Sequence, residues 1–172
     1  MRALLVFESM FGNTEAIARE IGVGLAVGMP VEIVEVTSAP TEIGADVGLL
    51  VVGGPTHAFG MSRPQTRADA SKQAMGHVVS QGRGIREWLD DVTCSTPLAA
   101  VAFDTRVKKS WLPGSAAKAA QKRLQRLGFS TPDAPQSFYV QGTPGPLVAG
   151  EPTRARAWGA QLSASLRQTP RR

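Results

Sequence analysis

The sequence is short of cysteine and of long apolar runs. Cys94 is the only cysteine among 172 residues, so the chain cannot form an internal disulfide or supply a thiolate metal site, and this composition fits a reducing compartment. The longest apolar runs, residues 3–7 and 47–52, are far shorter than a signal-peptide core or a membrane span. These absences predict a cytoplasmic protein without a membrane-spanning segment.

The motifs of several enzyme classes are also missing. The chain has no GxxxxGK[ST] and no GxGxxG, which argues against a P-loop nucleotide hydrolase and a dinucleotide-binding Rossmann unit. It has no paired carboxylates, no Ser/His/Asp arrangement at a recognisable spacing and no His/Cys cluster, so nothing supports a hydrolase or a metalloenzyme. We therefore predict no catalytic side chain and no metal ligand.

Size and composition favour one globular domain. The chain is 42% hydrophobic and 19% charged, and its length suits a single core better than two. We expect one domain over residues 1–172, ending in a basic tail at about 167–172.

Charge is distributed unevenly along the chain. Residues 104–172 carry twelve basic and three acidic residues, whereas residues 1–60 carry two basic and seven acidic ones. A basic half is typical of a solvated helix face, or of binding to an acidic protein, a nucleic acid or an anionic membrane. A nucleic acid is the weaker candidate, because the sequence has no basic stripe studded with aromatic residues and no helix-turn-helix signature.

Short apolar runs alternate with amphipathic stretches, which predicts an α/β fold. The expected strands are residues 3–8, 31–37, 47–53, 98–103 and 136–141, and the expected helices are residues 14–28, 85–89, 115–127 and 153–167. The third and fourth strands are nearly all apolar, as buried parallel strands tend to be. Right-handed crossovers would place helices on both faces of one sheet.

Two segments fit this alternation poorly. Residues 40–46 leave room for little more than one turn between the second and third strands. Residues 61–84 follow neither period, and so long an irregular segment in a small domain is usually functional or mobile. We expect a lid or an interaction loop there, with a loose helix over residues 66–79 left open.

The strongest chemical signal is Ser-Met-Phe-Gly-Asn-Thr at residues 9–14, between the first strand and the first long helix. A turn that enters a helix directs unpaired N–H groups at its occupant, and the helix dipole favours an anion, so a phosphate suits this position. Gly12 allows close approach, while Ser9, Asn13 and Thr14 offer hydrogen-bond donors. A helix entrance capped by Asn13 or Thr14 without a ligand remains the alternative.

At these residues the chain resembles the flavodoxin family, whose phosphate loop reads roughly [TS]-x-[TS]-G-N-T. Ser9, Gly12, Asn13 and Thr14 match this pattern, and Phe11 departs from it where many members have a hydroxyl residue. Residues 53–60, GGPTHAFG, and residues 104–106, DTR, follow the third and fourth strands, where the family places the loops that flank its flavin ring. The resemblance implies a doubly wound, five-stranded parallel sheet of order 2-1-3-4-5 with FMN at the switch point.

The resemblance also implies a set of FMN-binding residues: Ser9, Met10, Phe11, Gly12, Asn13, Thr14, Pro55, Thr56, His57, Ala58, Phe59, Gly60, Asp104, Thr105 and Arg106. Some of them have simpler interpretations that stay open. His57 would equally be a surface-loop histidine, Phe59 a core residue under the loop, and Asp104 a turn-forming aspartate.

The implied function is electron transfer through bound FMN. The protein would carry electrons to a redox partner protein, an acidic one if the basic half is its docking face, or act as a small flavin-dependent reductase with a small electron acceptor. Positive charge at Arg106, Lys108 and Lys109 near the ring would stabilise the reduced, anionic flavin. The alternative is a flavin-free interaction module that uses the basic half. The sequence leaves the oligomeric state open.

Overall fold

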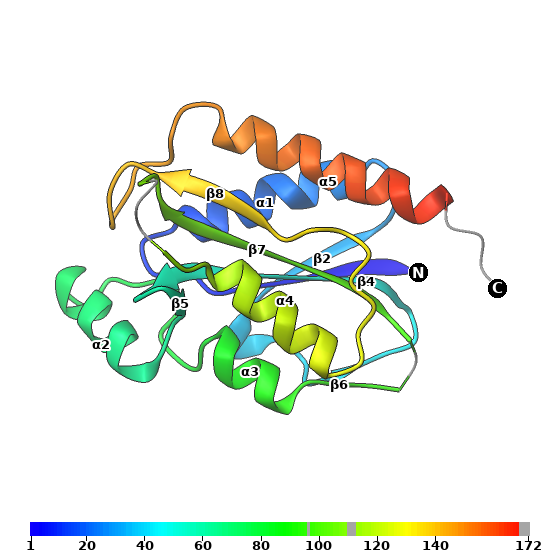
Figure 1. Cartoon of the computed structure of the whole chain (residues 1–172), viewed down its shortest axis with the longest axis horizontal. Coiled ribbons are helices and arrows are strands. Elements are labelled where there is room, and N and C mark those ends of the chain that lie inside the picture. Colours follow the sequence, from blue (N-terminus) through cyan, green and yellow to red (C-terminus); the bar gives the residue numbers. More distant parts are fainter. Residues whose placement is uncertain (96, 110–112, 169–172) are drawn as a thin grey trace.

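Five parallel strands form the central sheet of the computed structural model, which describes residues 1–95, 97–109 and 113–168 (Figure 1). They are β1 (Arg2–Phe7), β2 (Val31–Glu35), β4 (Val47–His57), β7 (Ala99–Val107) and β8 (Gln136–Val140). Their order is β2-β1-β4-β7-β8 and all neighbours are parallel. The predicted α/β class and the 2-1-3-4-5 order are therefore confirmed.

Helices cover both faces of this sheet, as predicted (Figure 1). Helices α1 (Asn13–Leu25) and α5 (Glu151–Gln168) lie side by side on one face, and α3 (Ile85–Asp91) and α4 (Ala116–Arg126) lie on the other. Each helix buries one apolar stripe: Ile17 and Ile21 of α1 and Trp158 of α5 enter one core, and Leu124 of α4 enters the other. None of the helices in the described ranges is long and apolar enough to cross a membrane.

Glycine brings α1 and α5 into direct contact. A Cβ atom on Gly159 of α5 would lie 2.2 Å from the backbone oxygen of Ile21, and one on Gly24 of α1 would lie 2.1 Å from that of Arg156. Both distances are far below van der Waals contact. The two helices therefore pack backbone against backbone at this crossing, which only residues without a side chain permit.

Strands β4 and β7 run further than predicted. Gly54 pairs with Asp104 and Pro55 with Thr105, so both strands continue beyond the apolar runs that marked them. The polar side chains Asp104 and Thr105 are buried here because they find partners at the carboxyl edge of the sheet. The hydropathy pattern alone therefore predicted ends for these two strands that are too early.

The region around residues 36–46 also differs from expectation. Strand β2 ends at Glu35, and Val36–Ser38 form a 3-10 turn in which the Glu35 carboxylate accepts a hydrogen bond from the Thr37 N–H. The turn expected over residues 40–46 is instead a short strand, β3 (Glu42–Ile43), paired with β6 (Thr93–Cys94).

Residues 61–84 contain a regular helix rather than an open lid. After β5 (Gly60–Met61), α2 spans Pro64–Gln73, so the helix starts before residue 66 and ends before residue 79. The periodicity missed it because Ala70 is its one buried residue. Beyond α2 the chain returns to the loop after β1, where the N–H groups of Val79 and Ser80 donate to the oxygens of Met10 and Ser9.

The C-terminal prediction is partly outside the described residues. Arg167 and Gln168 belong to α5. Residues 169–172 of the predicted basic tail lie outside the described part of the chain.

Candidate functional site

Three segments predicted to form the site meet at the carboxyl edge of the sheet. They line one hollow with a volume of about 80 Å³. Its predicted lining residues are Ser9, Met10, Phe11, Asn13, Thr14, Pro55, Thr56, His57, Thr105 and Arg106. Sequence reasoning missed Val107, Val140 and Thr143, because apolar or small residues at strand ends carry no chemical signal of their own.

The loop after β1 is shaped by Gly12. This residue is the N-cap of α1 and has φ of 88°, a left-handed conformation that favours glycine. No side chain caps the helix, so the predicted alternative of capping by Asn13 or Thr14 is wrong. The Ser9 hydroxyl accepts the Gly12 N–H at 3.1 Å, which holds the turn closed.

The first turn of α1 leaves N–H groups available. Within the described residues, the N–H groups of Asn13, Thr14 and Glu15 have no hydrogen-bond acceptor, as expected at an uncapped helix start. These donors and the positive end of the helix dipole point toward the loop, which is suited to an anion.

The side chains of Asn13 and Thr14 were expected to donate to a ligand, but both form hydrogen bonds within the protein. The Asn13 amide donates to the Pro144 oxygen at 3.1 Å, so it ties this loop to the one after β8. The Thr14 and Thr105 hydroxyls are 2.7 Å apart and share one hydrogen bond. Because two hydroxyls bring two protons, one proton of the pair remains for a ligand.

The end of β4 forms a hairpin with β5. Thr56 pairs with Met61 and His57 with Gly60, which leaves Ala58 and Phe59 at the tip with φ of 42° and 74°. Left-handed conformations cost non-glycine residues about 1 kcal/mol or more, and such strain gathers at functional sites. Phe59 is 59% exposed, so the alternative interpretation of it as a core residue under the loop is wrong.

A second hollow adjoins the first. It has a volume of about 140 Å³ and is lined by Thr56, Ala58, Phe59, Arg106, Val107 and Pro113. The two hollows share Thr56, Arg106 and Val107, so they lie next to each other between the loop after β1 and the hairpin tip, and together they are called the depression below. Arg106 is the charged side chain common to both.

Asp104 lies beneath this depression and lines neither hollow. It is fully buried, and its Oδ2 accepts hydrogen bonds from the Thr56 hydroxyl (3.0 Å), the Ser115 hydroxyl (2.6 Å) and the Ala117 N–H (2.9 Å). The Thr56 hydroxyl also accepts the Ala116 N–H. Asp104 and Thr56 therefore fasten the start of α4 to the end of β4, a supporting role rather than a turn.

His57 links the hollow to α2. Its Nδ1 lies 3.1 Å from the Thr66 hydroxyl, and its ring lines the first hollow. Burial and then the nearby positive charge of Arg67 lower the pKa of His57 below its ordinary value of 6.5. The histidine is thus a neutral, half-buried side chain at the end of a strand rather than a solvated loop residue.

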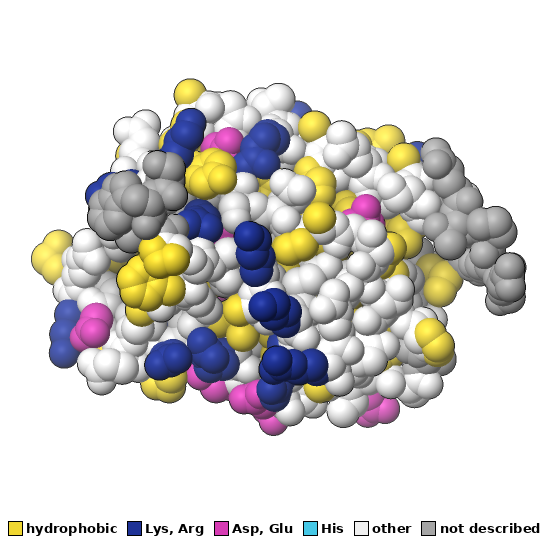
Figure 2. All heavy atoms as spheres, viewed as in Figure 1, with side chains coloured by type: hydrophobic (Ala, Val, Ile, Leu, Met, Phe, Trp, Pro, Cys, Tyr) yellow, Lys and Arg dark blue, Asp and Glu magenta, His cyan; other side chains and the backbone are white. Residues whose placement is uncertain are grey.

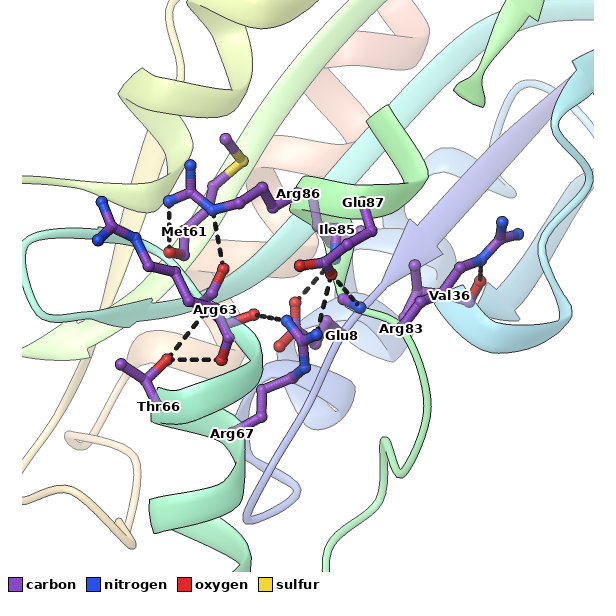
Figure 3. A network of polar contacts seen from close by, with 12 residues as sticks. Glu8, Val36, Met61, Arg63, Thr66, Arg67, Arg83, Ile85, Arg86 and Glu87 are labelled. Atoms are coloured by element: carbon purple, nitrogen blue, oxygen red, sulfur yellow. Dashed lines mark hydrogen bonds and ion pairs between the residues drawn. The ribbon is translucent and has the colours of Figure 1, made fainter. Parts of the chain in front are cut away.

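A buried polar network behind the loop was not predicted (Figure 3). Glu8, the residue before Ser9, is 1% exposed, and its Oε2 accepts the Ile85 N–H at 2.9 Å. Arg67 of α2 donates to the Ser62 hydroxyl at 2.9 Å and forms an ion pair with Glu87 at 3.0 Å. The one signal in the sequence was a glutamate that directly follows an apolar strand.

Two further arginines hold the segment that carries α2 (Figure 3). Arg86 donates to the oxygens of Met61 and Ser62, and Arg83 donates to the oxygens of Val36 and Ala39. Residues 61–84 are therefore attached at both ends to the body of the domain. This segment contacts the wall of the hollow through Thr66, which binds His57, and through the N–H groups of Val79 and Ser80, which bind the loop after β1.

Glu8 makes stability depend on pH. Burial raises its pKa above the ordinary value of 4.5, although the Ser62 hydroxyl and the Ile85 N–H oppose this. The stabilising contribution of the protonated group is complete below about pH 4.5 and is lost as pH rises through the raised pKa. Since glutamine does not titrate, the unfolding free energy of wild type minus that of Glu8→Gln should fall as the pH rises above about 4.5, as measured by urea unfolding.

A constant difference across this range would contradict a raised pKa for Glu8. The control is Glu42→Gln, which removes a carboxylate that is exposed on β3.

Comparison with known proteins identifies the fold. No protein-family model and no curated protein matches the sequence. Solved structures do match over nearly the whole chain. The chain has a flavodoxin-like fold.

Three of these structures illustrate the likeness. Flavodoxin 1 from Bacillus cereus is 17% identical with a TM-score of 0.65, over 99% of this chain and all of the other. A Streptococcus pneumoniae flavodoxin is 18% identical with a TM-score of 0.65, over 96% of this chain and 99% of the other. A flavodoxin described as WrbA-like, from Agrobacterium tumefaciens, is 16% identical with a TM-score of 0.58, over 98% and 99%. At these identities the comparison establishes the fold alone.

Proposed function

We propose that this chain binds FMN in the depression at the carboxyl edge of the sheet and transfers electrons through it. The observation that carries the proposal is the convergence of the loop after β1, the β4–β5 hairpin and the end of β7 on two adjoining hollows at the start of α1. Open α/β sheets bind ligands at this edge, where the strand order reverses. We further propose that residues 1–172 act as one domain in the cytoplasm, which the single cysteine supports.

The loop after β1 would hold the phosphate. The N–H groups of the first turn of α1 supply donors, and the pair of Thr14 and Thr105 supplies one hydroxyl proton. The residues proposed for the whole loop are Ser9, Met10, Phe11, Gly12, Asn13 and Thr14, of which Ser9 and Asn13 shape it through their own hydrogen bonds.

The hairpin and the end of β7 would hold the ring. The proposed residues are Pro55, Thr56, His57, Ala58, Phe59, Gly60, Thr105 and Arg106, with Asp104 supporting them from beneath. Phe59 offers an exposed aromatic face and Arg106 a positive charge beside both hollows. When bound, FMN supplies the redox chemistry, and the protein supplies orientation and electrostatics.

The charges of the site fit a phosphorylated cofactor. No Asp or Glu lines either hollow among residues 1–95, 97–109 and 113–168, whereas Arg106 lines both. The buried carboxylates of Glu8 and Asp104 accept hydrogen bonds from other parts of the chain. A phosphate dianion would therefore meet donors and positive charge without a facing carboxylate.

The partner we propose is an acidic redox protein. Figure 2 shows Lys and Arg side chains gathered on the face over α4. Lys118, Lys122 and Arg126 of α4 are exposed, as are Lys108 and Lys109 just beyond β7. Lys108 and Lys109 directly follow Val107, which lines both hollows. Docking by charge complementarity would weaken as salt increases.

The test is binding of FMN to the purified protein. We expect a yellow protein, or a colourless one that quenches FMN fluorescence with one-to-one saturation. Inorganic phosphate should compete with FMN, and riboflavin, which lacks the phosphate, should bind far more weakly. No colour and no quenching would contradict the proposal and would favour the flavin-free interaction module that uses the basic face.

A further inference from the structure

The hydrogen bond between His57 and α2 allows a tautomer to be assigned to the imidazole ring. The Thr66 hydroxyl accepts the Arg63 N–H at 2.9 Å and donates its single proton to the Arg63 oxygen at 3.0 Å. With this proton directed at the Arg63 oxygen, the hydroxyl accepts from His57, whose Nδ1 is 3.1 Å away, and we assign the ring proton to Nδ1 on this geometry. Neutral His57 then has its lone pair on Nε2, which has no hydrogen-bond partner among the described residues.

The charges around this ring are positive. Arg67 approaches it from α2, and Arg106 of β7 lines the same hollow. Arg86 of α3 lies close to Gly60, the hairpin partner of His57. The neighbouring carboxylates, Glu8 and Glu87, face Arg67 instead. These surroundings and burial keep His57 neutral until a negative charge arrives in the hollow.

We propose that His57 is a redox-linked proton acceptor, which takes up a proton on Nε2 when the bound flavin is reduced. This inference rests on the proposed function, because it needs a flavin in the depression that His57 lines. In the experiment below, dithionite supplies two electrons and water supplies two protons. One proton binds the flavin ring, which keeps one negative charge, and the other converts His57 to its cation.

Thr66 would be the positioning residue for this step. Its hydroxyl fixes Nδ1 as the protonated nitrogen, so Nε2 is the atom left to accept a proton. Thr66 belongs to α2, in the segment that Arg67 and Arg86 fasten to the domain. The helix that the sequence pattern left undecided thus orients a side chain of the site.

The test uses the two histidines of the chain, His57 and His77. Proton NMR follows both rings, and His57→Gln and His77→Gln assign the signals by removing one each. In the flavin-free protein we expect the pKa of His57 to lie below 6.5. In the FMN-loaded protein, reduction should raise its proton affinity about tenfold or more, a shift of one pKa unit or more.

The midpoint potential provides the second readout. We expect this at a pH between the His57 pKa values of the oxidised and the reduced FMN-loaded protein. There the pH dependence of the midpoint potential should correspond to two protons per two electrons in the wild type. In His57→Gln it should correspond to one proton per two electrons. His77→Gln is the matched control because His77 is exposed and outside both hollows, and it should keep two protons.

The outcomes separate this inference from the proposed function. FMN binding is measured first by fluorescence quenching. Two results would contradict the proton-acceptor role while leaving FMN binding intact. In the first, FMN binds and His57 has the same proton affinity in both redox states. In the second, FMN binds and His57→Gln still takes up two protons. If FMN does not bind, both proposals are wrong.

Discussion

The free energy of unfolding of a Gly159→Val variant is expected to be about 3 kcal/mol lower than that of the wild type. A Cβ at this position would lie 2.2 Å from the Ile21 oxygen and 3.1 Å from the Leu25 nitrogen, both backbone atoms of α1. Backbone cannot rotate aside, so α1 and α5 must separate and lose the apolar contacts between them. For a chain of this length the midpoint of thermal unfolding should fall by roughly 6–12 °C.

The matched control is Gln161→Val, which adds a β-branched residue at an exposed position of the same helix. It should change stability by less than about 1 kcal/mol. Equal stability of Gly159→Val and the wild type in urea unfolding would show that the helices can separate without loss, contrary to the packing described.

The second large effect is expected for Phe11→Asp on FMN binding. Phe11 is half-buried in the loop after β1 and lines the first hollow. A carboxylate there would face the FMN phosphate. Unit charges about 4 Å apart near a protein surface interact by about 4 kcal/mol, less where water and salt reach them. We expect the dissociation constant, measured by fluorescence quenching, to rise about 100-fold.

Phe11→Asn is the control for this prediction. Asparagine has the shape of aspartate without its charge, and both variants lose the contacts of Phe11 with the small cluster of Met10, Ala70 and Val78. The Asn variant should therefore bind FMN only a few-fold more weakly than the wild type. Equal effects of the two substitutions would mean that the phosphate does not lie beside residue 11.

The sheet could be predicted because its central strands are buried on both faces. Leu4 and Leu5 of β1 and Val51 and Val52 of β4 have almost no exposure, so each strand appears as a continuous apolar run. The strand ends could not be predicted in this way. Asp104 and Thr105 look like loop residues until Ser115, Ala117 and Thr14 are known to be their partners.

Helix α2 could not be assigned from the sequence, which left a loose helix over residues 66–79 open, for a related physical reason. A helix is recognised in a sequence by its apolar stripe, and α2 buries only Ala70. It is held by Arg67 and by the hydroxyl of Thr66, which bind Glu87, Ser62 and His57. Polar contacts of this kind join residues that are distant in the sequence and leave no periodic trace.

The candidate site was predictable where its geometry is local. The turn at Gly12 and the start of α1 follow from six consecutive residues. The contributions of Val107, Val140 and Thr143 depend on how β7 and β8 end side by side and on the loop after β8. The network around Glu8 depends on α2 and α3, and the sequence could not indicate that these two helices lie next to it.

The geometry of the loop after β1 depends on residues that are synthesised much later than the loop itself. Ser9 donates through its N–H to the Ser80 hydroxyl, and Asn13 binds the oxygen of Pro144. Residues 9–14 leave the ribosome early but cannot reach this geometry until residues 80 and 144 have followed. Long-range contacts of this kind slow folding, so the loop after β1 would be among the last parts of a newly made chain to acquire its shape.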